Sequence, residues 1–237
     1  IYNFLELRED LEKKGCVFKT KTDTEVLLQG LINEGIDFQL KCNGMWAFCL
    51  WDRKLSKAIL GRDRYGVKPL YYSFLEDNSL IFGSEMKSIT PFLKSITPSK
   101  YINLLFDPLH LFNYEATDQC VLSDIKRLKP GHNLTFEKDS ITINKYWNTL
   151  DHLEFKNDTY PNQVEDWKSL FLDSVRLRMR SDVPIGSALS GGLDSSAIVS
   201  AMATISKEKD KNNLLNDWQH VFCCSFPGSN LDETKWA

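Results

Sequence analysis

The stretch that most constrains the fold is residues 183–202, where an apolar run, two adjacent glycines and a second apolar run follow one another. The run at 185–189 predicts a short buried strand. Asp194 and the two serines after it are residue types that cap a helix, and Ala197, Ile198 and Val199 continue that helix. The stretch therefore predicts a strand, a glycine-rich turn and a helix start, which is the local plan of an α/β sheet.

This turn is predicted to bind an anion. Gly191 and Gly192 let the backbone approach a ligand, and the N–H groups at the start of the helix point at it. Ser190 and Ser195 add hydroxyl donors. Asp194 can hold a magnesium ion, because a hard cation prefers carboxylate and phosphate oxygens together. The alternative is a plain strand-to-helix turn that binds nothing.

The complete string SGGLDSS at 190–196 is more specific than its two glycines. It is not a Walker loop, because no Gly-Lys-Ser/Thr follows, and it lacks the three-glycine spacing of a dinucleotide fingerprint. It resembles the pyrophosphate-binding loop of the N-type ATP pyrophosphatases, which adenylate an oxygen and release pyrophosphate. The resemblance implies ATP and Mg²⁺ as cofactors, with Asp194 at the metal. The implied ATP and pyrophosphate contacts are Leu189, Ser190, Gly191, Gly192, Asp194, Ser195 and Cys224, of which Leu189 and Cys224 contact adenine through their backbones.

Composition narrows the class of protein. The 237 residues suffice for one large or two ordinary domains, and 42% apolar with 26% charged residues predict packed cores and a soluble surface. A formal net charge of −3 argues against nucleic acid or an anionic membrane as a partner. We find no signal peptide or membrane-spanning run and expect a cytoplasmic protein. The six cysteines have no Cys-x-x-Cys spacing, which predicts free, buried thiols.

The first third of the chain predicts two helices and a short strand. Residues 3–14 predict a helix, residues 16–18 a strand, and Thr22 with Glu25 forms a capping box for a helix that reaches about residue 34. Asp23 lies at the start of this second helix. Its carboxylate can cap the helix, face solvent or bind the amine of a ligand.

The next segments predict an antiparallel sheet covered by helices. Residues 45–51 are continuously apolar, which predicts a strand buried on both faces, and residues 58–60 return beside it. A second hairpin joins 70–74 to 80–82, and a helix is predicted from Ser84. Two further strands are predicted at 133–136 and 141–143.

Four strings in this part carry a second resemblance: GMWAF at 44–48, GRD at 61–63, GVKPLY at 66–71 and SEMK at 84–87. They resemble the class II glutamine amidotransferase domain of asparagine synthetases. With the later loop, they make nearly the whole chain similar to the glutamine-hydrolysing asparagine synthetase family. The implied fold class is α/β, with an α+β N-terminal part. That part is an Ntn-type αββα sandwich lacking its N-terminus, and the start of a doubly wound, Rossmann-like parallel sheet follows it.

The resemblance also implies a division of the chain. Residues 1–150 correspond to the glutamine amidotransferase domain, residues 151–162 to a polar linker, and residues 163–237 to the start of the ATP-pyrophosphatase domain. A helix is predicted from Val164, a polar loop at 207–217 and a second parallel strand at 220–226.

Several charged residues have two possible roles. Arg62 and Asp63 can form a structural ion pair at a sheet edge or face a substrate channel. His132 can be a solvated loop histidine or a base. Arginines near the end of the helix before residue 181 can complement the helix dipole or meet ATP phosphates; these are Arg176, Arg178 and Arg180.

The resemblance implies an enzyme that forms asparagine from aspartate, ATP and glutamine, with glutamate, AMP and pyrophosphate as the other products. Asp23 matches the residue that binds the amino group of glutamine. The family's nucleophile is an N-terminal cysteine, whereas this chain begins with Ile1, and the family's glutamine-holding Asn-Gly-Glu would fall just before it. We therefore assign no catalytic residue, and we expect a fragment that is inactive alone.

Other readings of the function stay open. A related amidotransferase or a β-lactam-synthetase-like enzyme would use the same plan on another carboxylate. A non-catalytic remnant would only bind nucleotide. The acceptor and the oligomeric state are left undecided by the sequence, and a homodimer is one option.

Overall fold

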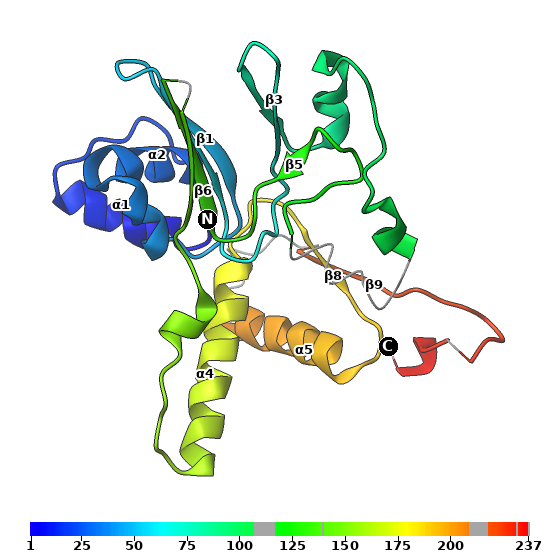
Figure 1. Cartoon of the computed structure of the whole chain (residues 1–237). Helices are drawn as coiled ribbons and strands as arrows, with labels where there is room; N and C mark the ends of the chain where they lie inside the picture. Colours follow the sequence, from blue (N-terminus) through cyan, green and yellow to red (C-terminus); the bar gives the residue numbers. More distant parts are fainter. Residues whose placement is uncertain (107–116, 139, 209–217, 231, 237) are drawn as a thin grey trace. The chain divides into compact units, whose positions relative to one another are not determined.

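The computed structural model describes residues 1–106, 117–138, 140–208, 218–230 and 232–236. The chain divides into two compact units (Figure 1). The first contains Ile1 and Asn3–Glu154, and the second contains Tyr2 and Phe155–Ala237. Within the described residues, no helix combines the length and the hydropathy that crossing a membrane requires.

The helices of the first unit follow the sequence pattern closely. They are α1 (Phe4–Lys13), α2 (Asp23–Glu34) and a 3₁₀ helix, η1 (Ile36–Lys41). Thr22 caps α2, because its side-chain oxygen accepts a hydrogen bond from the Glu25 N–H at 3.3 Å. This confirms the helix start that the sequence predicts.

The strand predicted at 16–18 is wrong. The Glu25 carboxylate accepts the N–H groups of Lys19 and Thr20 at 2.8 and 2.6 Å, so the chain before α2 curls around the start of that helix. Val17 is 78% exposed. These residues have no sheet neighbour, and Cys16 and Phe18 are half-buried against the core of the two helices without joining a strand.

Two antiparallel sheets follow the helices. The first has the strand order β1-β2-β6-β7 and the second the order β4-β3-β5. Both predicted hairpins and the predicted pair of later strands are confirmed. The strands are β1 (Ala47–Asp52), β2 (Lys57–Arg62), β3 (Tyr71–Phe74), β4 (Leu80–Gly83), β5 (Lys126–Arg127), β6 (His132–Glu137) and β7 (Ser140–Lys145).

The first unit is layered, as the alternating strand pattern requires. One face of the first sheet packs against α1 and α2 through a cluster that includes Leu11, Val26 and Phe38. Its other face meets the second sheet through a cluster that includes Leu60 and Leu134. Figure 1 shows the two helices lying along the sheet that contains β1 and β6. The observed α, β, β layers confirm a mixed α/β unit.

Two expectations about this unit are wrong. The apolar strand β1 is not buried on both faces, because among the described strands it lies at an edge and pairs only with β2, and Trp51 is 53% exposed. No α-helix begins at Ser84. Two short 3₁₀ helices, η2 (Met86–Ser88) and η3 (Thr90–Phe92), lie there instead, because Pro91 disfavours continued helix before it. The outer face of the second sheet packs on this irregular segment.

Further short elements complete the first unit. They are η4 (Ile102–Phe106) and η5 (Thr149–His152).

The thiols follow the prediction only in part: all six cysteines are free, but Cys49, Cys223 and Cys224 are exposed. Cys42 is buried, and this burial raises its pKa to about 12.

The second unit begins with a long helix and a short parallel sheet. Its elements are α4 (Tyr160–Arg178), β8 (Ile185–Ala188), α5 (Leu193–Glu208), β9 (Gln219–Phe222) and η7 (Thr234–Trp236). β8 and β9 pair in parallel, with Ala188 opposite Phe222. A core that includes Val175, Met202 and Ile205 joins α4 to α5.

Three features of the second unit differ from the prediction. α4 begins at Tyr160 rather than Val164, because Thr159 is extended and Pro161 suits the first turn of a helix. β8 is only half-buried, since β9 is its one sheet neighbour among the described strands. β9 ends at Phe222, so Cys223 and Cys224 lie beyond it. Most of the predicted loop at 207–217 lies outside the described residues.

Candidate functional site

The predicted anion loop connects β8 to α5 in the second unit. β8 ends at Ala188, α5 begins at Leu193, and Gly191 has φ +79° in the turn between them. That backbone conformation is one that residues with a side chain rarely adopt, so glycine is required there. The loop starts at the carboxyl end of a parallel strand, where open α/β sheets place their ligands.

The side chains of the loop bond mainly to one another. The hydroxyl groups of Ser190 and Ser195 lie 3.1 Å apart, and the Ser190 N–H donates to Ser195 Oγ at 3.2 Å. Ser195 Oγ also donates to the Gly192 carbonyl at 3.2 Å. These short-range bonds hold both hydroxyl groups at the first turn of α5. They can serve as donors to an anion that also meets the first N–H groups of the helix.

Asp194 lies in the first turn of α5 and is exposed. An acidic residue there stabilises the helix dipole without any ligand. Its carboxylate is also a hard oxygen donor beside the anion loop, which is the chemistry that Mg²⁺ requires. Among the described residues, no cluster of three or more His, Cys, Asp or Glu side chains forms a ready metal site. A magnesium ion here would therefore depend on phosphate oxygens for most of its ligands.

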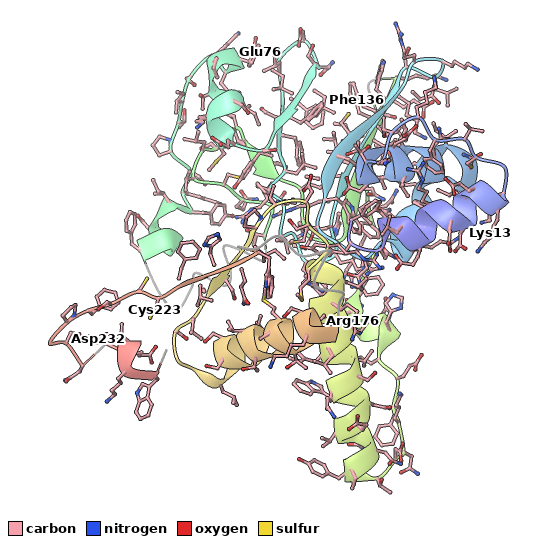
Figure 2. The ribbon with its side chains drawn as sticks, turned by 180° about the vertical axis from the view of Figure 1, so that it is seen from behind. Lys13, Glu76, Phe136, Arg176, Cys223 and Asp232 are labelled. Carbon is pink, nitrogen blue, oxygen red and sulfur yellow. The ribbon has the colours of Figure 1, made fainter. Side chains whose placement is uncertain are left out.

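The two predicted adenine contacts lie at the ends of adjacent strands. The Leu189 N–H donates to the Phe222 carbonyl at 2.9 Å, which continues the pairing of β8 with β9 one residue further. Cys224 follows two residues after Phe222 and is exposed. The backbone at Leu189 and Cys224 therefore lies at the carboxyl end of the two-stranded sheet, where the anion loop also begins. Figure 2 labels Cys223, which precedes Cys224 at this end of the sheet.

A pocket of about 310 Å³ lies in the first unit. Its lining comes from five places in the sequence: the chain start, the first half of α2, the start of β1 with the residues before it, and the segments before and after the second hairpin. The lining residues are Ile1, Asp23, Thr24, Leu27, Met45, Trp46, Ala47, Phe48, Lys68, Pro69 and Ser84. Residues from three of the four amidotransferase-like strings, GMWAF, GVKPLY and SEMK, line this pocket together. The sequence did not predict that these strings would meet.

Asp23 supplies the acidic group of this pocket. It is the first residue of α2, but the capping role belongs to Thr22, which excludes the simplest structural reading of Asp23. Asp23 Oδ2 lies 2.5 Å from the N-terminal ammonium group of Ile1. The Asp23 side chain keeps 43% of its surface exposed.

Arg62 and Asp63 lie beside the pocket, and backbone groups satisfy both charges. The Arg62 guanidinium donates to the carbonyls of Lys68, Leu128 and Gly66 at 2.8, 2.6 and 2.6 Å. The Asp63 carboxylate accepts backbone N–H groups instead. Arg62 is 6% exposed and Asp63 is 1% exposed. Both buried side chains thus have a structural role, and each holds its own set of backbone groups.

His132 is neither a solvated loop residue nor a residue of the pocket. It opens β6, is half-buried, and its Nδ1 lies 2.7 Å from the Pro130 carbonyl. Burial lowers the pKa of His132 below its ordinary value of 6.5.

Arg178 bonds to Ser174 on its own helix at 2.7 and 3.0 Å. This contact fits the predicted role at the end of the helix rather than a contact with ATP phosphates.

A larger cavity, of about 520 Å³, lies beside the β3–β4 hairpin near Glu76, which Figure 2 labels. It is a weaker candidate for a site. Glu76 forms an ion pair with Lys94, and Asp77 accepts the Ser79 N–H at 2.9 Å within its own turn. None of the predicted site residues lines this cavity. The smaller pocket with Asp23 therefore remains the candidate site of the first unit.

Comparison with protein families matches both units. The glutamine amidotransferase domain family matches residues 1–147, and the asparagine synthase family matches residues 166–237. The first match includes the whole lining of the pocket, and the second includes the whole anion loop.

Curated relatives are longer than this chain. A putative glutamine-hydrolysing asparagine synthetase 2 of Methanocaldococcus jannaschii is 37% identical over 100% of this chain and 43% of its own length. Glutamine-hydrolysing asparagine synthetase 3 of Bacillus subtilis is 38% identical over 86% of this chain and 32% of its own length. A more distant relative, amidase chry2 of Gibberella zeae, is 28% identical over 93% of this chain and 33% of its own length. The chain thus spans less than half of these relatives.

Proposed function

Because this chain belongs to the glutamine amidotransferase domain family over residues 1–147 and matches the asparagine synthase family over residues 166–237, we propose that it is part of a glutamine-hydrolysing asparagine synthetase. The complete enzyme would be an ATP-dependent carbon–nitrogen ligase. It would convert aspartate, ATP, glutamine and water into asparagine, AMP, pyrophosphate and glutamate. We place it in the cytoplasm, where free thiols such as those of this chain persist.

The observation that carries this proposal is that one chain holds both a pocket with an acidic side chain and a predicted anion loop. The acidic side chain of the pocket is Asp23, which keeps 43% of its surface exposed. In a chain that continues before Ile1, the Ile1 nitrogen would be a peptide amide, and Asp23 would be available to the α-ammonium group of glutamine. The pocket volume of about 310 Å³ suits an amino acid of that size.

In the second unit, the proposed ligand of the loop is the pyrophosphate part of ATP. Ser190, Ser195 and the first N–H groups of α5 would donate hydrogen bonds to it, and Gly191 and Gly192 would let it approach the backbone. Fixed donors stabilise the charge that develops as the pyrophosphate leaves. The backbone at Leu189 and Cys224 would contact adenine, by family resemblance.

Mg²⁺ fits this site through Asp194, whose exposed carboxylate in the first turn of α5 adds one oxygen ligand to those of the phosphates. When bound, the ion would neutralise phosphate charge during adenylation of the aspartate side chain. The Asp194 carboxylate would keep the triphosphate of ATP in one orientation. The N–H groups and hydroxyls of the loop would hold the pyrophosphate part. Ammonia from glutamine would then displace AMP.

The identity of the products tests the proposal. The full-length enzyme that contains this chain is incubated with ATP, aspartate and glutamine, and nucleotide, phosphate and amino-acid products are separated. We expect AMP, pyrophosphate and asparagine in equal amounts. ADP with orthophosphate, or no aspartate-dependent product, would rule the proposal out.

An enzyme that acts on another carboxylate is the alternative. The relative of Gibberella zeae that matches 93% of this chain is named an amidase, so not every relative is named an asparagine synthetase. AMP and pyrophosphate formed with a carboxylate other than aspartate would support this alternative.

A further inference from the structure

We propose that Asp63 is a positioning residue of the glutamine pocket, whose buried carboxylate holds two walls of that pocket at a fixed separation. This inference rests on the proposed function for the identity of the ligand. It concerns a residue that does not line the pocket and that would act through the backbone of its neighbours.

The carboxylate of Asp63 is buried and accepts four backbone N–H groups. Oδ1 accepts from Tyr65 and Val67 at 3.1 and 3.0 Å, and Oδ2 accepts from Lys68 and Trp46 at 2.9 and 3.3 Å. A carboxylate in the protein interior is costly unless hydrogen bonds replace its water. Four N–H groups directed at the two oxygens provide that replacement, so the geometry of the donors and the charge depend on each other.

The four donors come from two separate segments. Three belong to the turn just after Asp63, but Trp46 lies seventeen residues earlier, in the segment that leads into β1. The backbone repeats this link, because the Asp63 N–H donates to the Trp46 carbonyl at 2.9 Å. Trp46 and Lys68 both line the pocket. A single carboxylate oxygen, Oδ2, therefore joins one wall of the pocket to another.

Arg62 holds the same turn through its carbonyls. Its guanidinium bonds to the carbonyls of Gly66 and Lys68, while the Asp63 carboxylate bonds to the N–H groups of Tyr65, Val67 and Lys68. Gly66 has φ +66°, which allows the turn to present groups of both kinds inward. The turn is thus fixed by two adjacent side chains of opposite charge, one for each type of backbone group.

Other aspartates of this unit show what a merely local role looks like. Asp52 accepts the N–H groups of Lys54 and Leu55 at 2.9 and 3.1 Å, and both donors belong to its own turn at the far end of β1. No residue of that turn lines the pocket. Asp52 and Asp63 differ in that only Asp63 connects its turn to a second segment of the pocket wall.

Asp63→Asn tests this role. The side-chain amide keeps one oxygen, but its NH₂ group faces two of the four N–H donors, so two of the four bonds are lost. In the full-length enzyme, we expect the KM for glutamine to rise by about 10- to 100-fold, because small misplacements of binding groups are costly. Synthesis with ammonia should stay within about twofold, because ammonia does not need the pocket.

Two control variants separate positioning from stability. Asp52→Ala removes both of the side-chain bonds that hold a distant turn. Ser73→Ala removes a buried hydroxyl that donates to the Asp124 carbonyl at 2.6 Å, outside the pocket. Both should leave the KM for glutamine unchanged. If the controls raise the KM as much as Asp63→Asn does, or if Asp63→Asn leaves it unchanged, the positioning role is wrong.

A second readout does not need the reaction. In the full-length enzyme, Asp63→Asn should accelerate hydrogen exchange of the two amides that face its NH₂ group, either Trp46 with Lys68 or Tyr65 with Val67, by at least about tenfold relative to the Leu134 amide, since an opened hydrogen bond exposes its N–H. Unchanged exchange at all four amides would contradict the inference. If Asp63→Asn does not fold, Arg62→Lys loses the guanidinium fork that the carbonyls require and should raise the KM in the same way. An unchanged KM in Arg62→Lys would then overturn the inference.

The outcomes distinguish the inference from the proposed function. If the unaltered enzyme uses no glutamine, the proposed function fails. If the unaltered enzyme uses glutamine and Asp63→Asn has the same KM, only the positioning role fails.

Discussion

The loop of the second unit and the pocket of the first are built in opposite ways. The loop side chains bond within six consecutive residues, 190–195, and most of them are exposed. The pocket gathers residues from Ile1 to Ser84, and its walls are joined by the buried carboxylate of Asp63. A local site needs only its own segment to be in place, whereas a dispersed site needs the whole unit to be folded. Substitutions in the loop should therefore affect chemistry alone, and substitutions around the pocket should couple binding to packing.

The largest expected effect is on asparagine synthesis, which should be lost while glutamine hydrolysis is kept. In the full-length enzyme, Asp194→Ala should lower asparagine synthesis by at least about 100-fold with either glutamine or ammonia, because the proposed magnesium ligand is lost. Glutamine hydrolysis should persist. Pyrophosphate and glutamate release measure the two activities. Asp173→Ala, a matched exposed aspartate on α4, should change neither, and normal synthesis by Asp194→Ala would rule out the metal role.

Asp23→Ala should affect the other activity. Losing a hydrogen bond to a charged amine of about 1.5–3 kcal/mol corresponds to a rise in the KM for glutamine of about 10- to 150-fold, with ammonia-dependent synthesis unchanged. Thr22→Ala is the matched control, because it removes the cap of the same helix at a cost of about 1 kcal/mol but keeps the carboxylate. Equal loss with glutamine and ammonia in Asp23→Ala, or an equal KM effect in Thr22→Ala, would favour a folding role.

The exposed thiols allow the proposed nucleotide site to be tested directly. Cys223 and Cys224 follow β9, whereas Cys49 is an exposed cysteine of the first unit. ATP with Mg²⁺ at ten times its Kd leaves about a tenth of the sites free, so alkylation of Cys224 should slow by about tenfold in the full-length enzyme. Partial burial raises the pKa of Cys49, which makes its reaction slower, but ATP should leave its rate unchanged. Equal protection of Cys49 and Cys224 would contradict the placement of adenine.

The smallest effect concerns the support of α2, the helix that carries Asp23. Hydrogen bonds from the Thr20 hydroxyl and the Lys19 N–H hold the pKa of Glu25 below its ordinary value of 4.5. A lowered folded-state pKa means that this stabilisation is present above pH 4.5 and is lost as the pH falls through the folded-state pKa. The Lys19 and Thr20 amide shifts should therefore titrate with a midpoint below 4.5, and Glu25→Gln should abolish that titration. A midpoint at or above 4.5 would contradict this account.

The same contrast explains what the sequence could predict. The loop and its flanking strand and helix were predicted because all their determinants are contiguous, and the antiparallel hairpins were predicted because turn residues separate apolar runs. The role of Asp63 was not, since an aspartate that bonds to its own turn and one that also bonds to Trp46 look identical in sequence. Burial of β1 was overestimated because an apolar pattern does not show which strand is at an edge of the sheet.

We propose that two separable sites on one chain pass nitrogen from glutamine to a carboxylate. The direct test gives the full-length enzyme [amide-¹⁵N]glutamine together with unlabelled ammonia, ATP and aspartate, and measures the isotope in asparagine. We predict ¹⁵N-asparagine from the unaltered enzyme and mainly ¹⁴N-asparagine from Asp23→Ala. Asp194→Ala should form no asparagine but should still release ¹⁵N-ammonia. Loss of both activities in each variant, or ¹⁵N-asparagine from Asp23→Ala at the level of the unaltered enzyme, would contradict the account.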